Sequence, residues 1–243
     1  MEKNNELLKI NIDLDNFVYT ASHDLKAPIT NLEGLMNLLK QQFEYKLEVD
    51  DREILDMMAT SIHKFKKTIL DLTEITKVQK GLDDKTEPLS FKEVLEEVKT
   101  DLNPIIKESG AFINENLKIQ QVSFSPNNLR SIFYNLISNA IKYRSLHKPL
   151  EISINTYQEN NFIVLSVSDN GLGISETNKP KLFSMFKRFH SHVEGTGIGL
   201  YVIKRILENN RGKIEFESKE GEGTIFKVYF QTQDQKVLTN VKT

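Results

Sequence analysis

The chain has 243 residues, a formal net charge of −2 and no cysteine. This length suffices for one or two domains with hydrophobic cores. The lack of cysteine excludes disulfides and thiolate metal sites, and the small net charge gives no long-range attraction to nucleic acid. No apolar run approaches the roughly 20 residues of a membrane span, and no signal-peptide pattern opens the chain. We therefore expect a cytoplasmic protein that inserts nothing into a membrane, or the cytoplasmic core of a longer membrane-bound protein.

The first part of the chain predicts a helical hairpin. Its apolar residues recur at steps of three or four, which at about 100° per residue keeps them on one stripe. The first stripe comprises Leu14, Phe17, Ala21, Leu25, Pro28, Leu32, Leu35 and Leu39, and the second, after a polar break at 44–53, comprises Ile54, Met58, Ile62, Phe65, Ile69, Leu72 and Ile75. Residues 1–13 extend the first stripe as a coiled-coil linker. One hairpin leaves much of this surface in water, so two copies are expected to pair into a four-helix bundle.

The second part predicts a sheet with helices packed against it. Gly81, two aspartates and Pro88 mark a linker between the two parts. The expected elements are helices at 90–109, 127–143 and 197–209, a strand hairpin at 150–157 and 162–169, a second at 213–218 and 224–230, and a loose tail at 232–243.

His23 is the first candidate for chemistry. It lies about 180° from the apolar stripe and is expected to face water, with Asp24 beside it to take or orient an imidazole proton. Neutral imidazole is a nucleophile, and its pKa of about 6.5 leaves it mostly neutral in a cell. A solvated surface histidine is the simpler explanation. Pro28 costs the helix a hydrogen bond, which indicates a specific reason for this sequence. His190 and His192 lack a further ligand set, so a metal site is not predicted there.

Two amides and a lysine follow on the helix at 127–143. Asn135 and Asn139 are four residues apart and share one face, and Lys142 follows one turn later. An amide carbonyl suits Mg²⁺, which also binds phosphates, and the ammonium suits a phosphate. Capping or solvent-facing amides would produce the same pattern.

Two glycine motifs complete a candidate nucleotide site. In DNGLGI, Asp169 ends a strand and can accept a hydrogen bond from an exocyclic amine such as that of adenine. Glycines at 195, 197 and 199 then run into a helix whose exposed amides favour an anion. Their spacing matches neither the P-loop nor the dinucleotide-binding pattern. Ordinary turns explain each motif taken alone.

Taken together and in order, the motifs resemble those of the sensor histidine kinases of two-component signalling. SHDLKAP resembles the H-box, NLISNAIKY the N-box, DNGLGI the first glycine box, KLFSMFKRF the F-box, GTGIGL the second glycine box and GEGT the third. The resemblance spans residues 14 to 230. It implies an α+β protein with a dimerising hairpin at 14–80 and an α/β sandwich at 87–231, of the ATP-binding type shared with Hsp90 and gyrase.

The resemblance also implies an activity and a role for each candidate residue. The chain would phosphorylate His23 with ATP and then pass the phosphoryl group to an aspartate of a response regulator receiver domain. Asp24 would orient His23 or act as its base, and Asn139 would ligate Mg²⁺. The nucleotide would be bound by Asn135, Lys142, Tyr143, Asp169, Gly171, Gly173, Arg188, Gly195, Thr196, Gly197, Gly199 and Thr224.

This resemblance comes with departures from the family pattern and with two alternatives. Ala27 stands where the family often has Thr or Asn to position water, which predicts weak phosphatase activity. The short segment 189–194 predicts a small lid and modest nucleotide affinity. An ATPase of the Hsp90, MutL and gyrase group would need no SHDLKAP segment. A dimeric scaffold that binds nucleotide only as a conformational ligand would need no phosphoacceptor.

Overall fold

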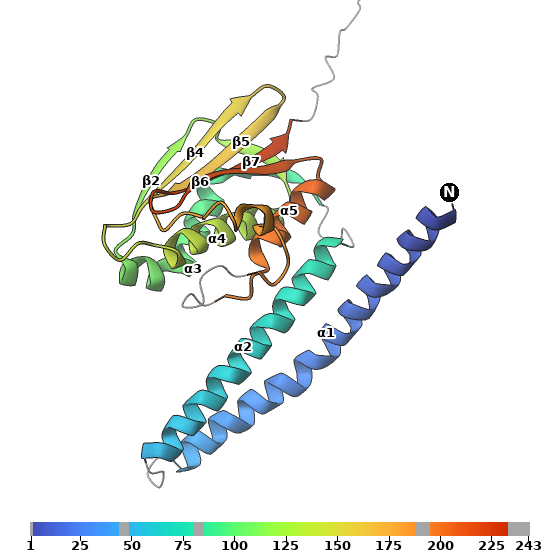
Figure 1. The fold of residues 1–243 in the computed structure, drawn as a ribbon, viewed down its shortest axis with the longest axis vertical. Coiled ribbons are helices and arrows are strands. Elements are labelled where there is room, and N and C mark those ends of the chain that lie inside the picture. The colour runs from blue at the N-terminus through green and yellow to red at the C-terminus, as the bar shows by residue number, and fades with distance from the viewer. Residues whose placement is uncertain (1, 44–48, 80–84, 188–194, 233–243) are drawn as a thin grey trace, which may run out of the picture.

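A computed structural model describes residues 2–43, 49–79, 85–187 and 195–232. Two long antiparallel helices form a hairpin that projects from an α/β domain (Figure 1). The second helix lies nearer to the α/β domain than the first. The expected α+β class, with a helical hairpin followed by an α/β domain, is confirmed. No helix in the described ranges has the length and apolar character needed to cross a membrane.

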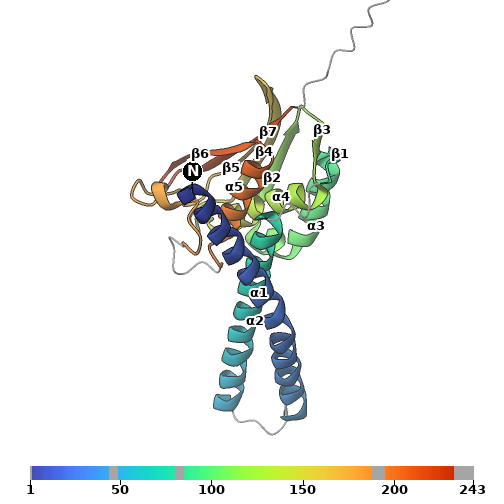
Figure 2. The same ribbon diagram turned by 90° about the vertical axis from the view of Figure 1, so that its right-hand side faces the viewer.

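Helices α1 (Glu2–Phe43) and α2 (Val49–Gln79) form the hairpin (Figure 2). Two ion pairs fix their register, one between Lys66 and Glu33 and the other between Lys40 and Asp56, at 2.5 Å. Helix α2 begins at Val49, inside the polar segment 44–53. Acidic residues at 50 and 51 lie in its first turn, where the helix dipole favours negative charge.

On α1, the hairpin buries a different line of residues from the predicted stripe. Ser22, Ile29 and Met36 of α1 are 2%, 2% and 5% exposed, and they recur every seven residues. The stripe residues Leu25, Leu32, Leu35, Leu39, Ile54, Met58 and Phe65 are instead exposed in the single chain. One hairpin therefore leaves most of the predicted stripe uncovered, as expected, although Ile69 of the second stripe is 2% exposed. Each helix of a bundle has two neighbours, and periodicity alone does not say which neighbour a residue meets.

Pro28 lies inside α1 without ending it. Because proline has no N–H, it cannot donate to the carbonyl of Asp24, four residues earlier. The helix nevertheless continues to Phe43, as the apolar periodicity on both sides of the proline predicts.

The α/β domain is built on a five-stranded sheet in the order β2-β4-β5-β7-β6. Its strands are β2 (Phe112–Leu117), β4 (Glu151–Glu159), β5 (Phe162–Asp169), β6 (Lys213–Lys219) and β7 (Gly223–Gln231). Only β2 and β4 pair in parallel. Both expected strand hairpins are present. Strand β2, and the separate ribbon of β1 (Glu87–Ser90) with β3 (Gln121–Phe124), were not predicted.

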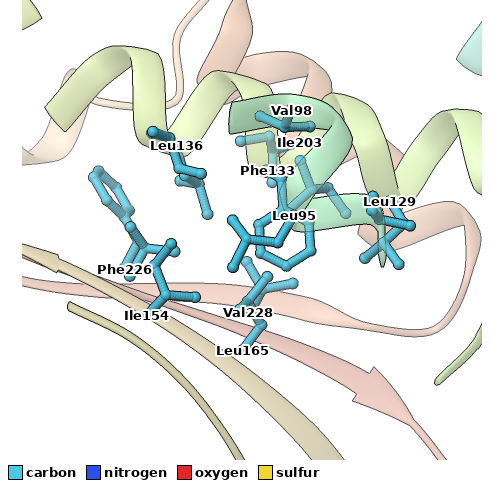
Figure 3. Close-up of a cluster of buried hydrophobic side chains, with 14 of the residues drawn as sticks. Leu95, Val98, Leu129, Phe133, Leu136, Ile154, Leu165, Ile203, Phe226 and Val228 are labelled. Carbon is cyan, nitrogen blue, oxygen red and sulfur yellow. The ribbon is translucent and has the colours of Figure 1, made fainter. Parts of the chain in front are cut away.

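Helices α3 (Phe91–Ser109), α4 (Pro126–Lys142) and α5 (Gly199–Asn209) pack on one face of this sheet. Ser90 and Ser125 cap the first two, and each side-chain oxygen accepts from an amide three residues later. Figure 3 shows Leu95, Phe133 and Ile203 from the three helices meeting Ile154 and Val228 from the strands. This core holds α4 rigidly beside the strand ends. Helix α5 begins two residues later than expected, so Gly197 lies in the preceding loop.

The end of β7 bears on the expected tail. Thr232 donates from its amide to the carbonyl of Asn161, 3.0 Å away, and so belongs to the domain and not to a loose tail. Residues 233–243 lie outside the described residues.

Candidate functional site

A cavity of about 660 Å³ lies between α4, the start of α5 and the ends of β5 and β7. It collects most of the residues that the motifs single out. Those in its wall are Asn135, Asn139, Lys142, Tyr143, Asp169, Gly173, Gly195, Thr196, Gly197, Gly199 and Thr224. Segments that are up to about 90 residues apart in the sequence therefore form one site.

The polar face of α4 forms one wall of the cavity. The amide nitrogen of Asn135 donates to the carbonyl of Ser131 at 2.9 Å, which leaves its carbonyl oxygen directed towards the start of α5. A Cβ atom at Gly199 would lie 2.2 Å from that oxygen. Gly199 therefore lets the second glycine box approach the N-box helix closely. Asn139 and Lys142 continue the same face, with a second amide and a positive charge.

Asp169 closes one end of the cavity at the end of β5. Its Oδ1 accepts from the amide of Gly171 at 2.8 Å, and the amide of Thr224 also donates to the carboxylate. Burial raises the pKa of this carboxyl from 3.8 to about 6, against the opposing effects of these two amides and of Lys148. A half-buried carboxylate facing a cavity is suited to accept a hydrogen bond from a ligand N–H.

The first glycine box is folded tightly behind Asp169. Gly171 lies outside the cavity wall, and its role is to let the chain turn beside the carboxylate. Gly173 has φ of 65°, and a Cβ atom there would lie 2.0 Å from the carbonyl oxygen of Lys219. The amide of Gly221 donates to the carbonyl of Leu172 at 2.7 Å. The first and third glycine boxes are therefore joined through their backbones.

The F-box is anchored next to the second glycine box. Phe183 packs edge-on against Phe216 with ring centres 5.8 Å apart, and the amide of Phe186 donates to the carbonyl of Gly197 at 3.0 Å. These contacts bring Lys187 into the cavity wall. Arg188, expected at a terminal phosphate, lies outside the described residues, as do His190 and His192.

His23 and Asp24 lie on α1 and not in the cavity wall. The Asp24 side chain is exposed. The expected direction of the His23 side chain falls outside what the structure describes. The hairpin register places His23 opposite residues 73–76 of α2. The one hairpin residue in the described cavity wall is Lys67, on α2.

Several residues of the cavity wall were not predicted from the sequence, among them Asn127, Ser131 and Lys67. Asn127 and Ser131 precede Asn135 at steps of four on α4, so their spacing was a usable signal. Lys67 carried no such signal, because its place depends on how the hairpin meets the α/β domain.

Two protein-family models match this chain, one over the helical hairpin and one over most of the α/β domain. Residues 13–81 match the family model described as His Kinase A (phospho-acceptor) domain. Residues 125–234 match the model described as Histidine kinase-, DNA gyrase B-, and HSP90-like ATPase. The two matches occur in this order and together cover most of the chain.

The chain belongs to the sensor histidine kinases. Among curated relatives of this family, Phytochrome-like protein Cph1 of Synechocystis is 33% identical over 225 residues, which are 90% of this chain and 29% of Cph1. Sensor histidine kinase YkoH of Bacillus subtilis is 29% identical over 222 residues, which are 90% of this chain and 48% of YkoH. The chain thus spans less than half the length of either relative.

Solved histidine kinase structures share the fold. ShkA in complex with AMPPNP superposes with a TM-score of 0.73 at 20% identity, over 90% of this chain and 46% of ShkA. AdeS of Acinetobacter baumannii superposes with a TM-score of 0.63 at 22% identity, over 87% of this chain and 98% of AdeS. At these identities, the likeness establishes the architecture of the histidine kinase core.

Proposed function

We propose that this chain transfers the γ-phosphoryl group of ATP to His23 and then to an aspartate of a response regulator receiver domain. One observation carries the proposal. The N-box and glycine-box residues line a single cavity, in the same chain as the helix that bears SHDLKAP. The hairpin at 14–80 would be the phosphotransfer domain and 87–231 the catalytic domain.

The adenine would bind at the Asp169 end of the cavity. Its exocyclic amine would donate to the Asp169 carboxylate, with Tyr143 and Thr224 beside it. The phosphates would lie along α4 towards the second glycine box, next to Lys142, Asn135 and residues 195–199. Arg188 would contact the terminal phosphate. The cavity has room for a nucleotide, since small-molecule pockets span about 300–1,000 Å³.

Asn139 would hold Mg²⁺ together with the phosphates. The described residues contain no group of three or more His, Cys, Asp or Glu side chains that would bind a metal alone. One amide carbonyl fits an ion that binds protein through one or two oxygens and otherwise uses phosphates and water. When bound, Mg²⁺ neutralises phosphate charge.

Neutral His23 would attack the γ-phosphate in line, and Asp24 would hold the imidazole in the reactive orientation. Lys67 marks where the cavity meets the hairpin, six to nine residues along α2 from the level of His23. That separation is roughly 9–14 Å at 1.5 Å per residue. For transfer within one chain, the catalytic domain would therefore have to move along the hairpin, a rigid-body change typical of switching proteins.

Two copies would pair through the uncovered apolar side of the hairpin. Leu32 and Leu35 are 51% and 59% exposed in the single chain, and Phe65 of α2 is 51% exposed. Pairing into a four-helix bundle would remove this surface from water. Ala27 is exposed near His23 and brings no hydroxyl or amide to position water, so we propose weak phosphatase activity towards the partner.

The decisive test is incubation with γ-labelled ATP and Mg²⁺, comparing the parent protein with His23→Gln. Acid-labile, alkali-stable label on the parent alone supports the proposal. Label on both proteins places the acceptor elsewhere. Release of inorganic phosphate without protein label favours an ATPase of the Hsp90 and gyrase group. Nucleotide binding with neither label nor turnover favours a scaffold.

A further inference from the structure

Lys67 joins the nucleotide cavity from the other domain. It lies on α2, and its side chain lines the same cavity as Asn135 and Lys142 of α4. Helix α2 is held there by Leu72, which packs against the core of the α/β domain. Ile69, two residues beyond Lys67, is 2% exposed. The packing of Ile69 and Leu72 therefore fixes the part of α2 that follows Lys67.

The cavity has a direction along α4, and Lys67 enters its wall from α2, which packs against α5. Asp169 and Tyr143 mark one end, and Asn135 meets Gly199 further along α4. Beyond Asn135 the wall continues one and two turns along α4 through Ser131 and Asn127, which are roughly 6 and 12 Å further at 1.5 Å per residue. A nucleotide with its base at Asp169 would extend along α4 towards the start of α5, the helix against which α2 packs.

The ammonium of Lys67 is available to a ligand. Among the residues that the structure describes, it takes part in no ion pair, although the neighbouring Lys66 pairs with Glu33. Arg130, which also lines the cavity, already pairs with Asp101 and lies 4.0 Å from Glu97. Where the hairpin meets the cavity, Lys67 is thus a cation without an acidic partner among the residues that the structure describes.

We propose that Lys67 binds the terminal phosphate of ATP across the domain boundary. Bound ATP then docks the catalytic domain on α2 more firmly than ADP does, because only ATP extends far enough along α4. The inference rests on the proposed function. It adds a residue of the hairpin to the nucleotide site and a reason for the domain position to depend on which nucleotide is bound.

The test compares affinities of the full chain for AMPPNP and ADP, with Mg²⁺, in the parent, Lys67→Met and Lys67→Arg. Lys64→Met is the matched control, since Lys64 is one turn earlier on α2 and lines a separate hollow between α1 and α2. We expect Lys67→Met to weaken AMPPNP binding about threefold to tenfold and ADP binding less than about twofold, as loss of one charge-assisted contact predicts. Lys67→Arg should retain the AMPPNP preference.

The outcomes separate this inference from the function on which it rests. Equal AMPPNP affinities for the parent, Lys67→Met and Lys64→Met would overturn the Lys67 contact alone. An equal loss of AMPPNP and ADP binding in Lys67→Met would also overturn it, because the terminal phosphate would not be involved. Failure of the parent to bind either nucleotide would overturn the proposed function and this contact together.

Discussion

The backbone carbonyl of Tyr143 accepts a hydrogen bond of 2.9 Å from the amide of Leu172. This bond ties the end of α4 to the middle of the first glycine box. Leu172 in turn accepts from Gly221 of the third glycine box at 2.7 Å. Three motifs that are far apart in the sequence therefore share one backbone network, and a change in one of them is expected to disturb the others.

Gly173→Ala tests this network. Alanine at φ of 65° is strained, and its Cβ would lie 2.0 Å from the Lys219 carbonyl oxygen, so the loop must shift. We expect a loss of stability of about 3 kcal/mol and a loss of nucleotide binding of at least about tenfold. Denaturant unfolding and calorimetric titration measure the two effects.

Gly110→Ala is the matched control for Gly173→Ala. Gly110 has a similar φ of 63°, but nothing lies within 4 Å of a Cβ built there. The free energy of unfolding of the control should fall by only about 1–2 kcal/mol, the cost of an alanine in the left-handed region. Its nucleotide affinity should equal that of the parent. Equal effects of both substitutions would argue against a backbone network at Gly173.

Asp169→Asn should separate binding from stability. The amide oxygen of asparagine still accepts from Gly171, but the charged acceptor for the adenine amine is lost. We expect nucleotide affinity to fall at least about tenfold, as for loss of a buried charged hydrogen bond. Calorimetric titration with ADP measures this, and unchanged affinity would remove Asp169 from the site.

The pH dependence of stability has a definite sign at Asp169. Its pKa is raised from 3.8 to about 6 in the folded protein, so the folded state binds the proton more tightly than the unfolded state. Its contribution to stability is present below about pH 4 and is lost as the pH rises through about 6. The parent should therefore lose stability relative to Asp169→Asn between pH 4 and 6, as urea unfolding would show; a constant difference would contradict this assignment.

Lys148→Met should shift the pH range in which nucleotide binds. The Lys148 ammonium donates to the carbonyl of Gly221 at 3.2 Å, and its charge lowers the pKa of Asp169. Without it, the pKa of Asp169 rises further, and the loss of ADP affinity on acidification should begin at higher pH than in the parent. Affinities should be expressed relative to Asp169→Asn at each pH, which cancels titration of the nucleotide.

Lys118→Met is the control for Lys148→Met. Lys118 is an exposed lysine that donates from its amide to Thr156, far along β4 from the residues that pair with Asp169. Its removal changes the net charge equally and should leave the pH profile of binding in place.

Leu35→Glu should dissociate the proposed dimer. Leu35 is 59% exposed in the single chain and belongs to the uncovered apolar side of α1. A charge buried at a bundle interface without a partner is strongly unfavourable, so we expect monomers at micromolar concentration. Sedimentation equilibrium measures the mass. Thr30→Glu, about 140° away around the same helix, should remain dimeric.

Long, strongly periodic elements were predictable from the sequence, and short ones were not. The strand FINENL alternates in burial along Phe112–Leu117, but it has only six residues and pairs with β4, whose first residue is more than 30 positions later. No sequence pattern near either strand predicts such a parallel pairing. Strand β3 has four residues and is too short for periodicity to identify.

The same contrast holds at the site. Asn135, Asn139 and Asp169 were identifiable because each motif fixes its own local geometry. The buried line through Ile29 and Met36 was not predicted, because a helix in a bundle carries two apolar lines and the predicted stripe is the more continuous one. Lys67 depends on contacts between domains, and no pattern within α2 encodes them.

Pro28 gives α1 a point of low bending stiffness. The carbonyl of Asp24 has no amide donor four residues ahead, so the turn that follows His23 lacks one of the bonds that keep a helix straight. Below this turn, Ile29 and Met36 are clamped against α2. This turn is therefore the point at which the segment that carries His23, the proposed acceptor, would bend most easily relative to the packed segment through Ile29 and Met36.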